Sequence, residues 1–140
     1  MEQKSTFYLD SNIFVYASVN NEQLGQKARR LLQAMRTGTL QGITSCLTFD
    51  EVIWVLKKMM PEQLAAAGEQ ILDLHVKFLS VDKPLLHSML FLIEEYALQP
   101  RDALHLATMQ SQKVSIIISE DKDFDKIPGI ERRSLLSLAI

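Results

Sequence analysis

Four carboxylates occupy the same kind of position in this chain, where an apolar run ends or a helix is expected to begin. They are Asp10, Glu51, Asp102 and Asp121. In an α/β fold such junctions gather at one edge of the sheet, the edge at which ligands bind. Acids that converge there repel one another, and keeping them ionised is unfavourable unless a cation lies between them. The pattern therefore predicts a divalent-metal site that serves metal-assisted phosphodiester chemistry.

Each of the four acids also has a purely structural explanation when it is taken alone. Asp10 and Asp121 follow expected strands and fit the cap of the helix or turn that comes next. Glu51 stands three residues after Thr48, which is the spacing of a capping box. Asp102 lies in a first helical turn, where the helix dipole favours a negative charge. Only the joint pattern favours a metal site over four independent caps.

The residues beside these acids indicate which kind of ion the site would take. Asn12 and Ser119 are short polar neighbours of Asp10 and Asp121, and they are expected to hydrogen-bond and orient the two acids. Oxygen-rich sites favour Mg²⁺ or Mn²⁺, whereas Zn²⁺ prefers nitrogen and sulfur ligands. The sequence has no cysteine–histidine ligand spacing, so a hard cation is predicted.

The segment 120–125 holds four acids, more than one metal site requires. Asp121 is nearest the expected strand end and ranks first as a ligand, with Asp123 second. Glu120 and Asp125 are expected to be solvated or capping groups.

The histidines are weaker candidates for the site. His105 follows Asp102 by three residues and shares its helical face, so it can approach the site. A packed or hydrogen-bonded role is nevertheless the preferred interpretation for His105, and helical surface or packing roles are expected for His75 and His87. No nucleophile motif, glycine-rich phosphate loop or dinucleotide fingerprint is present.

Size and charge limit the classes of function. The 140 residues fit a single domain, 1–140, and the composition is that of an ordinary soluble protein. The net charge of −2 means that nucleic-acid binding must be local, bridged by metal or helped by another chain. No apolar run reaches the roughly 18 to 20 residues that span a bilayer, and no signal-peptide layout is present. The lone Cys46 excludes an internal disulfide; a buried thiol and a cytoplasmic location are expected.

Short apolar strands alternate with helices along the whole chain, which predicts an α/β fold with a parallel sheet covered on both faces. Strands are expected at residues 6–9, 41–45, 78–81 and 114–118, with an edge strand near 131–135. Helices are expected at 11–19, 22–35, 49–59, from Pro61 onward, at 85–98 and at 100–112.

Four of these segments, taken in order, resemble the PIN-domain ribonucleases, and among them the VapC-type toxins of toxin–antitoxin pairs. They are Leu-Asp-Ser-Asn-Ile-Phe at 9–14, Glu51 in an early helical turn, Arg-Asp-Ala-Leu-His-Leu-Ala at 101–107 and Ser-x-Asp-x-Asp-Phe at 119–124. The resemblance covers essentially the whole chain. Ser119 departs mildly from the threonine that is common at its position, but it keeps the hydroxyl group.

The resemblance implies a three-layer α/β/α sandwich with a mainly parallel sheet of about five strands. It also implies a Mg²⁺- or Mn²⁺-dependent endoribonuclease that acts on single-stranded or structured RNA. Asp10, Glu51, Asp102 and Asp121 would form the acidic quartet, with Asp123 as a fifth acid and with Asn12 and Ser119 as supporting polar groups. Asp10, Asp102 and Asp121 are the strongest metal-ligand candidates, whereas Glu51 is either a ligand or the water-orienting base.

The resemblance further implies a homodimer and a separately encoded antitoxin whose segment blocks the acidic cleft. Several apolar residues are candidates for such contacts, with ordinary core packing as the preferred explanation for each: Phe14, Tyr16, Ile53, Trp54, Leu56, Met59 and Met60.

Two other functions remain open from the residues. In a phosphatase of the haloacid dehalogenase type, a strand-ending aspartate such as Asp10 acts as nucleophile, but Asn12 stands where a second aspartate is expected. The non-enzymatic alternative is a PIN-like RNA- or protein-binding module that keeps its acids for a structural metal.

Overall fold

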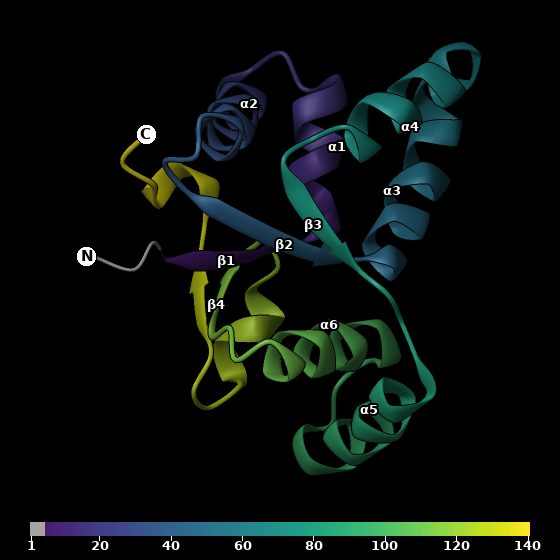
Figure 1. The fold of residues 1–140 in the computed structure, drawn as a ribbon, viewed down its shortest axis with the longest axis vertical. Coiled ribbons are helices and arrows are strands. Elements are labelled where there is room, and N and C mark those ends of the chain that lie inside the picture. Colours follow the sequence, from purple (N-terminus) through teal and green to yellow (C-terminus); the bar gives the residue numbers. More distant parts are fainter. Residues whose placement is uncertain (1–4) are drawn as a thin grey trace.

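A five-stranded parallel sheet organises the computed structural model, which describes residues 5–140 (Figure 1). The strands are β1 (Thr6–Leu9), β2 (Gln41–Ser45), β3 (Val76–Leu79), β4 (Ile116–Ile118) and β5 (Glu131–Arg133). Their order is β3-β2-β1-β4-β5, and every pairing is parallel. The predicted α/β class and parallel sheet are therefore confirmed, including the edge position of the last strand.

The strand order creates a switch point between β1 and β4. From β1 the chain builds outward through β2 and β3, whereas β4 and β5 are added on the other side of β1. Tyr8 pairs with Ile117 and Leu9 with Ile118, so the two central strands end side by side. In sheets of this kind the crevice outside the carboxyl ends at the switch point is the usual ligand site.

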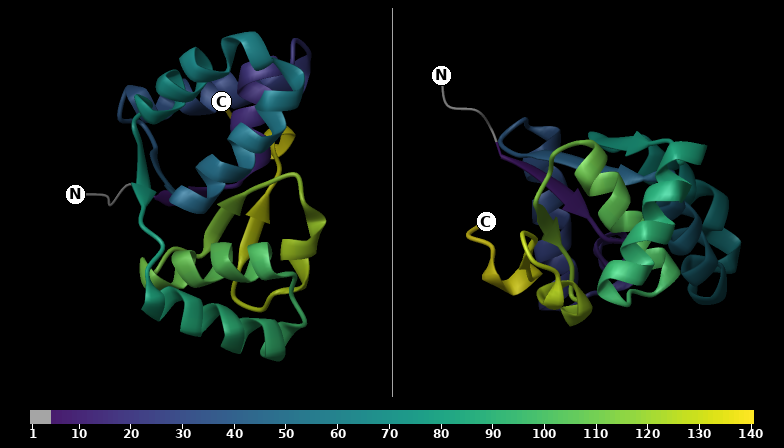
Figure 2. Two further views of the ribbon diagram at one scale, coloured as in Figure 1. Left: turned by 90° about the vertical axis from the view of Figure 1, so that its right-hand side faces the viewer. Right: turned by 90° about the horizontal axis from the view of Figure 1, so that it is seen from below.

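Within residues 5–140, six α-helices cover the two faces of the sheet (Figures 1 and 2). They are α1 (Ser11–Val19), α2 (Gln23–Arg36), α3 (Cys46–Met59), α4 (Leu64–Leu72), α5 (Lys83–Tyr96) and α6 (Pro100–Ser111). Three short 3-10 turns lie between or after these elements: η1 (Pro61–Gln63), η2 (Lys122–Lys126) and η3 (Leu135–Ser137). Helices α1 to α4 lie on one side of the sheet and α5 with α6 on the other, which confirms the predicted three-layer sandwich.

The two-residue period of the strands divides the core into two apolar clusters. Phe7 and Leu9 point into the cluster with α1 to α4, whereas Tyr8 between them points into the cluster with α5 and α6. Ile118 and Ile117 alternate in the same way on β4. Because both faces are buried, the central strands read as continuous apolar runs.

Two predicted helix starts are wrong because their capping residues were overlooked, and the third strand lies two residues earlier than predicted. Helix α3 begins at Cys46 rather than 49, because Ser45 caps it by accepting a hydrogen bond from Leu47 N at 2.9 Å. Helix α5 begins at Lys83 rather than 85, because the Asp82 carboxylate accepts from Leu85 N at 3.0 Å. The third strand is Val76–Leu79 rather than 78–81.

Several single-residue expectations are also corrected. Cys46 is exposed rather than buried, because it is the first residue of α3. His75 lies exposed in the bend before β3 rather than in a helix. Of the apolar contact candidates, Leu56 is buried in the core, whereas the side chain of Trp54 is 60% exposed. No helix in the described part of the chain is long and apolar enough to cross a membrane.

Phe124 anchors the segment that follows β4. This residue of η2 is fully buried in the apolar cluster beneath the sheet, together with Ile117 and Ile127. Its neighbours Asp121 and Asp123 are partly or fully exposed. The ring therefore holds an otherwise polar turn against the end of the sheet.

We expect Phe124→Ala to lower the free energy of unfolding by about 3–5 kcal/mol, because a fully buried ring is replaced by a cavity. Leu136→Ala, at a residue of η3 that is 51% exposed, should change it by less than about 1 kcal/mol. Urea denaturation of the two variants measures both values. Equal losses in the two would show that Phe124 does not anchor the turn.

Candidate active site

Asp10 is the first residue after β1 and lies at the switch-point edge of the sheet. Its Oδ1 accepts a hydrogen bond from Ser11 N at 2.7 Å and so caps α1, as its position in the sequence predicted. Its own backbone N donates to Ile118 O at 3.1 Å, which ties it to the end of β4. The residue is only 6% exposed. Its carboxylate is therefore held in place at this edge of the sheet.

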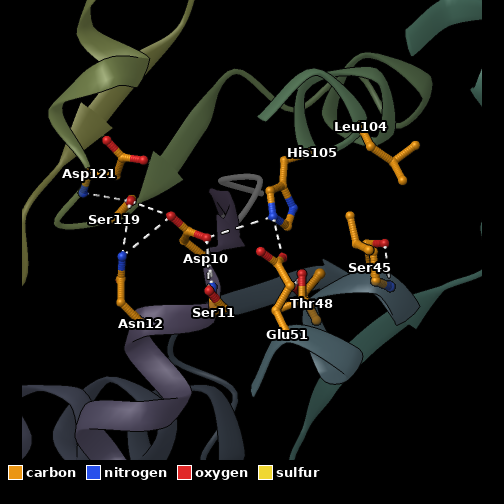
Figure 3. A network of polar contacts seen from close by, with 12 residues as sticks. Asp10, Ser11, Asn12, Ser45, Thr48, Glu51, Leu104, His105, Ser119 and Asp121 are labelled. Carbon is orange, nitrogen blue, oxygen red and sulfur yellow. Dashed lines mark hydrogen bonds and ion pairs between the residues drawn. The ribbon is translucent and has the colours of Figure 1, made fainter. Parts of the chain in front are cut away.

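The Ser119 hydroxyl joins the ends of β1 and β4 (Figure 3). It donates to Asp10 Oδ2 at 2.5 Å and accepts from Asp121 N at 2.9 Å. Asn12 Nδ2 lies 3.4 Å from both Asp10 Oδ2 and Ser119 Oγ. The two short polar residues that the sequence pairs with these acids thus contact them directly.

Three acids converge above this edge. Asp102, Asp121 and Asp123 each offer a carboxylate oxygen, and these three oxygens lie within 4.8 Å of one another. Asp102 comes from the first turn of α6, whereas Asp121 caps η2 by accepting from Asp123 N at 2.9 Å. Asp10 and Glu51 lie outside this three-oxygen group.

Burial and repulsion act together on Asp102. They raise the pKa of its carboxyl from 3.8 to about 6; desolvation is the largest cause and the charge of Asp121 the next. The charges of Asp10 and Asp123 add to the effect, and His105 opposes it. A site made only of crowded carboxylate oxygens fits a hard cation such as Mg²⁺ or Mn²⁺, which would relieve the repulsion.

Glu51 reaches the edge from the second turn of α3. The proposed capping box with Thr48 is wrong, because the helix already begins at Cys46, two residues before Thr48, and Ser45 caps it. The Thr48 hydroxyl instead pairs with that of Thr44 at 2.8 Å. Glu51 is consequently free of a capping role, and its Oε1 lies 2.7 Å from His105 Nε2.

His105 lies between the acids as well as in the core. It is 1% exposed; its Nδ1 is 2.6 Å from the Tyr8 hydroxyl, and its Nε2 is 3.8 Å from Asp10 Oδ1. Burial by itself lowers the pKa of His105, but the hydrogen bond to Glu51 and the nearby negative charges outweigh burial and raise it. Burial raises the pKa of Tyr8 well above its usual range. The three-residue spacing from Asp102 indicated that His105 could approach the site, and the packed, hydrogen-bonded role preferred for it agrees with these contacts, whereas no sequence signal indicated Tyr8.

The other two acids of the 120–125 segment have partners away from the three-oxygen group. Glu120 Oε1 accepts from Leu135 N at 2.7 Å. Asp125 forms two hydrogen bonds with Arg132, at 2.8 and 3.1 Å, and the guanidinium lowers the pKa of this carboxyl. These contacts agree with the structural roles expected for both residues.

Comparison with known proteins identifies the family. The chain belongs to the PIN domain family, whose sequence profile matches residues 7–130. It is 28% identical over 127 residues to VapC ribonuclease Mb1869c of Mycobacterium bovis and to ribonuclease VapC13 of Mycobacterium tuberculosis, covering 89% of this chain and 96% of each relative.

Solved structures share the fold. The chain is similar to the DNA-bound VapBC structure from Salmonella typhimurium, with a TM-score of 0.73 and 18% identity over 95% of this chain and 99% of the other. It is also similar to VapC20 of Mycobacterium tuberculosis, a toxin that cleaves the sarcin–ricin loop, with a TM-score of 0.69 and 18% identity over 86% and 93% of the two chains. At these identities the likeness establishes the fold alone.

The raised pKa of Asp102 has a measurable consequence in the metal-free protein. Because the folded state holds this proton more tightly than the unfolded chain, the resulting stabilisation is complete below about pH 4 and is lost as the pH rises through about 6. Near neutral pH, the free energy of unfolding of Asp102→Asn should therefore exceed that of the wild type. At pH 4, where the wild-type carboxyl is protonated, this difference should be smaller.

Carbon-13 NMR of the Asp102 carboxyl measures this directly, with a midpoint near pH 6 expected in the wild type. Asp121→Asn should lower the midpoint, because the charge of Asp121 is the largest electrostatic cause. A wild-type midpoint near pH 4 would contradict the crowding of these acids.

Proposed function

We propose that this chain is a single-domain, divalent-metal-dependent endoribonuclease that hydrolyses RNA phosphodiester bonds, and that it is the toxin of a toxin–antitoxin pair. The observation that carries the proposal is the convergence of Asp102, Asp121 and Asp123 beside Asp10 at the switch-point crevice. Membership of the PIN family and the VapC ribonucleases among its relatives support it.

Asp102, Asp121 and Asp123 would hold the ion, Mg²⁺ or Mn²⁺, with the nearly buried Asp10 as a further ligand from the end of β1. When bound, the ion supplies Lewis acidity at the phosphate and lowers the pKa of a coordinated water. The hydrogen bond from Ser119 directs Asp10 Oδ2, and the cap of α1 directs Oδ1, so this acid is oriented before an ion arrives.

Glu51 has a different place in the proposed reaction. It lies outside the three-oxygen group but next to Asp10 through His105, so we propose that it orients the attacking water and accepts its proton. The water oxygen forms a bond to phosphorus as the bond from phosphorus to the leaving ribose oxygen breaks, and the leaving oxygen takes up a proton from solvent. Water is the nucleophile, so the reaction needs no covalent bond to the protein.

We expect Asp102→Asn and Glu51→Gln each to reduce RNA cleavage by at least about 100-fold, because each removes a group that acts on the reacting atoms. Asp50→Asn, at an exposed acid beside Glu51 on α3, is the matched control and should cleave like the wild type. The measurement is gel-resolved cleavage of a synthetic RNA set with Mg²⁺ or Mn²⁺, and with EDTA.

Cleavage that persists undiminished in EDTA or in the Asp102 variant would overturn the proposed function. Metal binding without cleavage would assign the chain to the non-enzymatic binding modules. A trapped aspartyl-phosphate on Asp10 would instead favour a phosphatase.

We further propose two protein partners and a cytoplasmic site of action. An antitoxin is proposed because solved structures that share this fold are toxin–antitoxin complexes. A homodimer is supported by the exposed apolar side chains on the outside of the sandwich. These are Leu86, Leu90 and Phe91 on α5, and Trp54 and Met59 on α3.

Sedimentation velocity tests both partners in one series. The chain alone should sediment as a dimer, and Leu90→Glu with Phe91→Glu should shift it toward the monomer, because charge would be buried at the interface. Adding the product of the neighbouring gene should give a larger complex in which RNA cleavage is suppressed. A monomeric wild type would contradict the homodimer, and unchanged cleavage would contradict the antitoxin.

A further inference from the structure

A buried chain of hydrogen bonds joins three elements that are far apart in the sequence. Tyr8 in β1 contacts His105 in α6, and His105 contacts Glu51 in α3. Figure 3 shows the last of these contacts, with the His105 ring between Glu51 and Asp10. We propose that Tyr8 and His105 are positioning residues that set the orientation of the Glu51 carboxylate. The proposal rests on the function assigned to Glu51 above.

The imidazole ring is fixed at both of its nitrogens. Nδ1 lies 2.6 Å from the Tyr8 hydroxyl, and Nε2 lies 2.7 Å from Glu51 Oε1. The two rings also meet edge to face, with centroids 5.5 Å apart and an angle of 68° between their planes. Rotation of the ring about its bond to the helix would break both contacts at once, so the position of Nε2 is determined by the core.

Tyr8 is itself held rigidly. It is the third residue of β1, it pairs with Ile117 of β4, and it is fully buried. Next to Tyr8 in β1, Leu9 O accepts a hydrogen bond from the Thr44 hydroxyl of β2 at 2.7 Å, and the Thr48 hydroxyl lies 2.8 Å from that of Thr44. The support for His105 therefore extends into the central strands rather than into a mobile surface.

Glu51 needs such support because its surroundings repel it. His105 Nε2 is 2.7 Å from Glu51 but also 3.8 Å from Asp10 Oδ1, so one donor stands between two acids. Without the imidazole the two carboxylates would repel each other, and Glu51, whose side chain is 14% exposed, could turn toward solvent. The short contact with His105 keeps it at the edge of the sheet beside Asp10.

The same contact divides the two oxygens of Glu51 between two tasks. A carboxylate only accepts hydrogen bonds, so the hydrogen of this bond is carried by Nε2, and the Tyr8 hydroxyl can donate to Nδ1. Oε1 is thereby engaged by His105. Oε2 is the oxygen that would receive the proton of the attacking water. A packing role alone would not require both nitrogens to be hydrogen-bonded, since an apolar side chain could fill the same volume.

Two substitutions separate the two halves of the ring. In His105→Gln the amide nitrogen can take the place of Nε2 and still donate to Glu51. In His105→Asn the amide can reach the position of Nδ1 and Tyr8, but not Glu51. Both variants replace the same buried ring with a smaller amide, so both should lose a similar amount of thermal stability. His87→Asn, at an exposed histidine of α5, is the control for the substitution itself.

We expect His105→Asn to lower kcat for RNA cleavage by about 10- to 100-fold with little change in KM, as is typical when a supporting group is lost. His105→Gln should retain a kcat at least about tenfold higher than that of the asparagine variant. Equal kcat in the two variants, or losses that follow their melting temperatures, would overturn the positioning role. The kcat values of the two His105 variants are compared only if Asp102→Asn abolishes cleavage. Cleavage that persists in Asp102→Asn would contradict the proposed function itself rather than the positioning role.

A second measurement does not depend on activity. In the metal-free wild type, the His105 imidazole Nε2–H should give a proton–nitrogen NMR signal protected from solvent exchange, and Asp102→Asn should retain it. Glu51→Ala should remove the protection, and Tyr8→Phe should shift the nitrogen resonance of Nδ1. A signal that is insensitive to Glu51→Ala would contradict the proposed link whether or not the protein cleaves RNA.

Discussion

Mutual repulsion among carboxylates at the carboxyl edge of the sheet is the constraint on which the rest of this site depends. Asp102, Asp121 and Asp123 place oxygens within 4.8 Å of one another, and the pKa of Asp102 rises to about 6 as a result of burial and of its neighbours. Bringing these three carboxylates together during folding is electrostatically unfavourable, so contacts with the surrounding structure must hold them in place. The same repulsion makes a hard cation, and through it a phosphodiester, the natural partner of the edge.

Asp10 connects two halves of the site that do different work. On one side the Ser119 hydroxyl donates a hydrogen bond to Asp10 Oδ2 and accepts one from Asp121 N, which links Asp10 to the acids proposed to hold the ion. On the other side His105 stands between Oδ1 and Glu51, which links it to the acid proposed to handle the proton. A short hydroxyl and a buried imidazole thus place the two functions next to each other without merging them.

The site residues that the sequence located best are those whose position follows from a strand end. Asp10 and Ser119 end apolar runs, so their gathering at one edge followed from the parallel topology. The role of Glu51 was harder to predict, because Ser45 rather than Thr48 caps its helix. Only the observed helix start shows that Glu51 has no capping role and can face α6. Cys46, exposed at that same helix start, was misjudged for the same reason.

The sequence by itself determined the α/β class, the parallel sheet and the set of acids that could share its edge, because strand and helix periodicities and their junctions are local properties of the chain. Only the tertiary structure decided which acids meet. Contacts such as His105 with Glu51, 54 residues apart, and Tyr8 with His105, 97 apart, depend on how α3 and α6 pack across β1. No local pattern encodes that packing, because it is fixed by the shared core and not by any one segment.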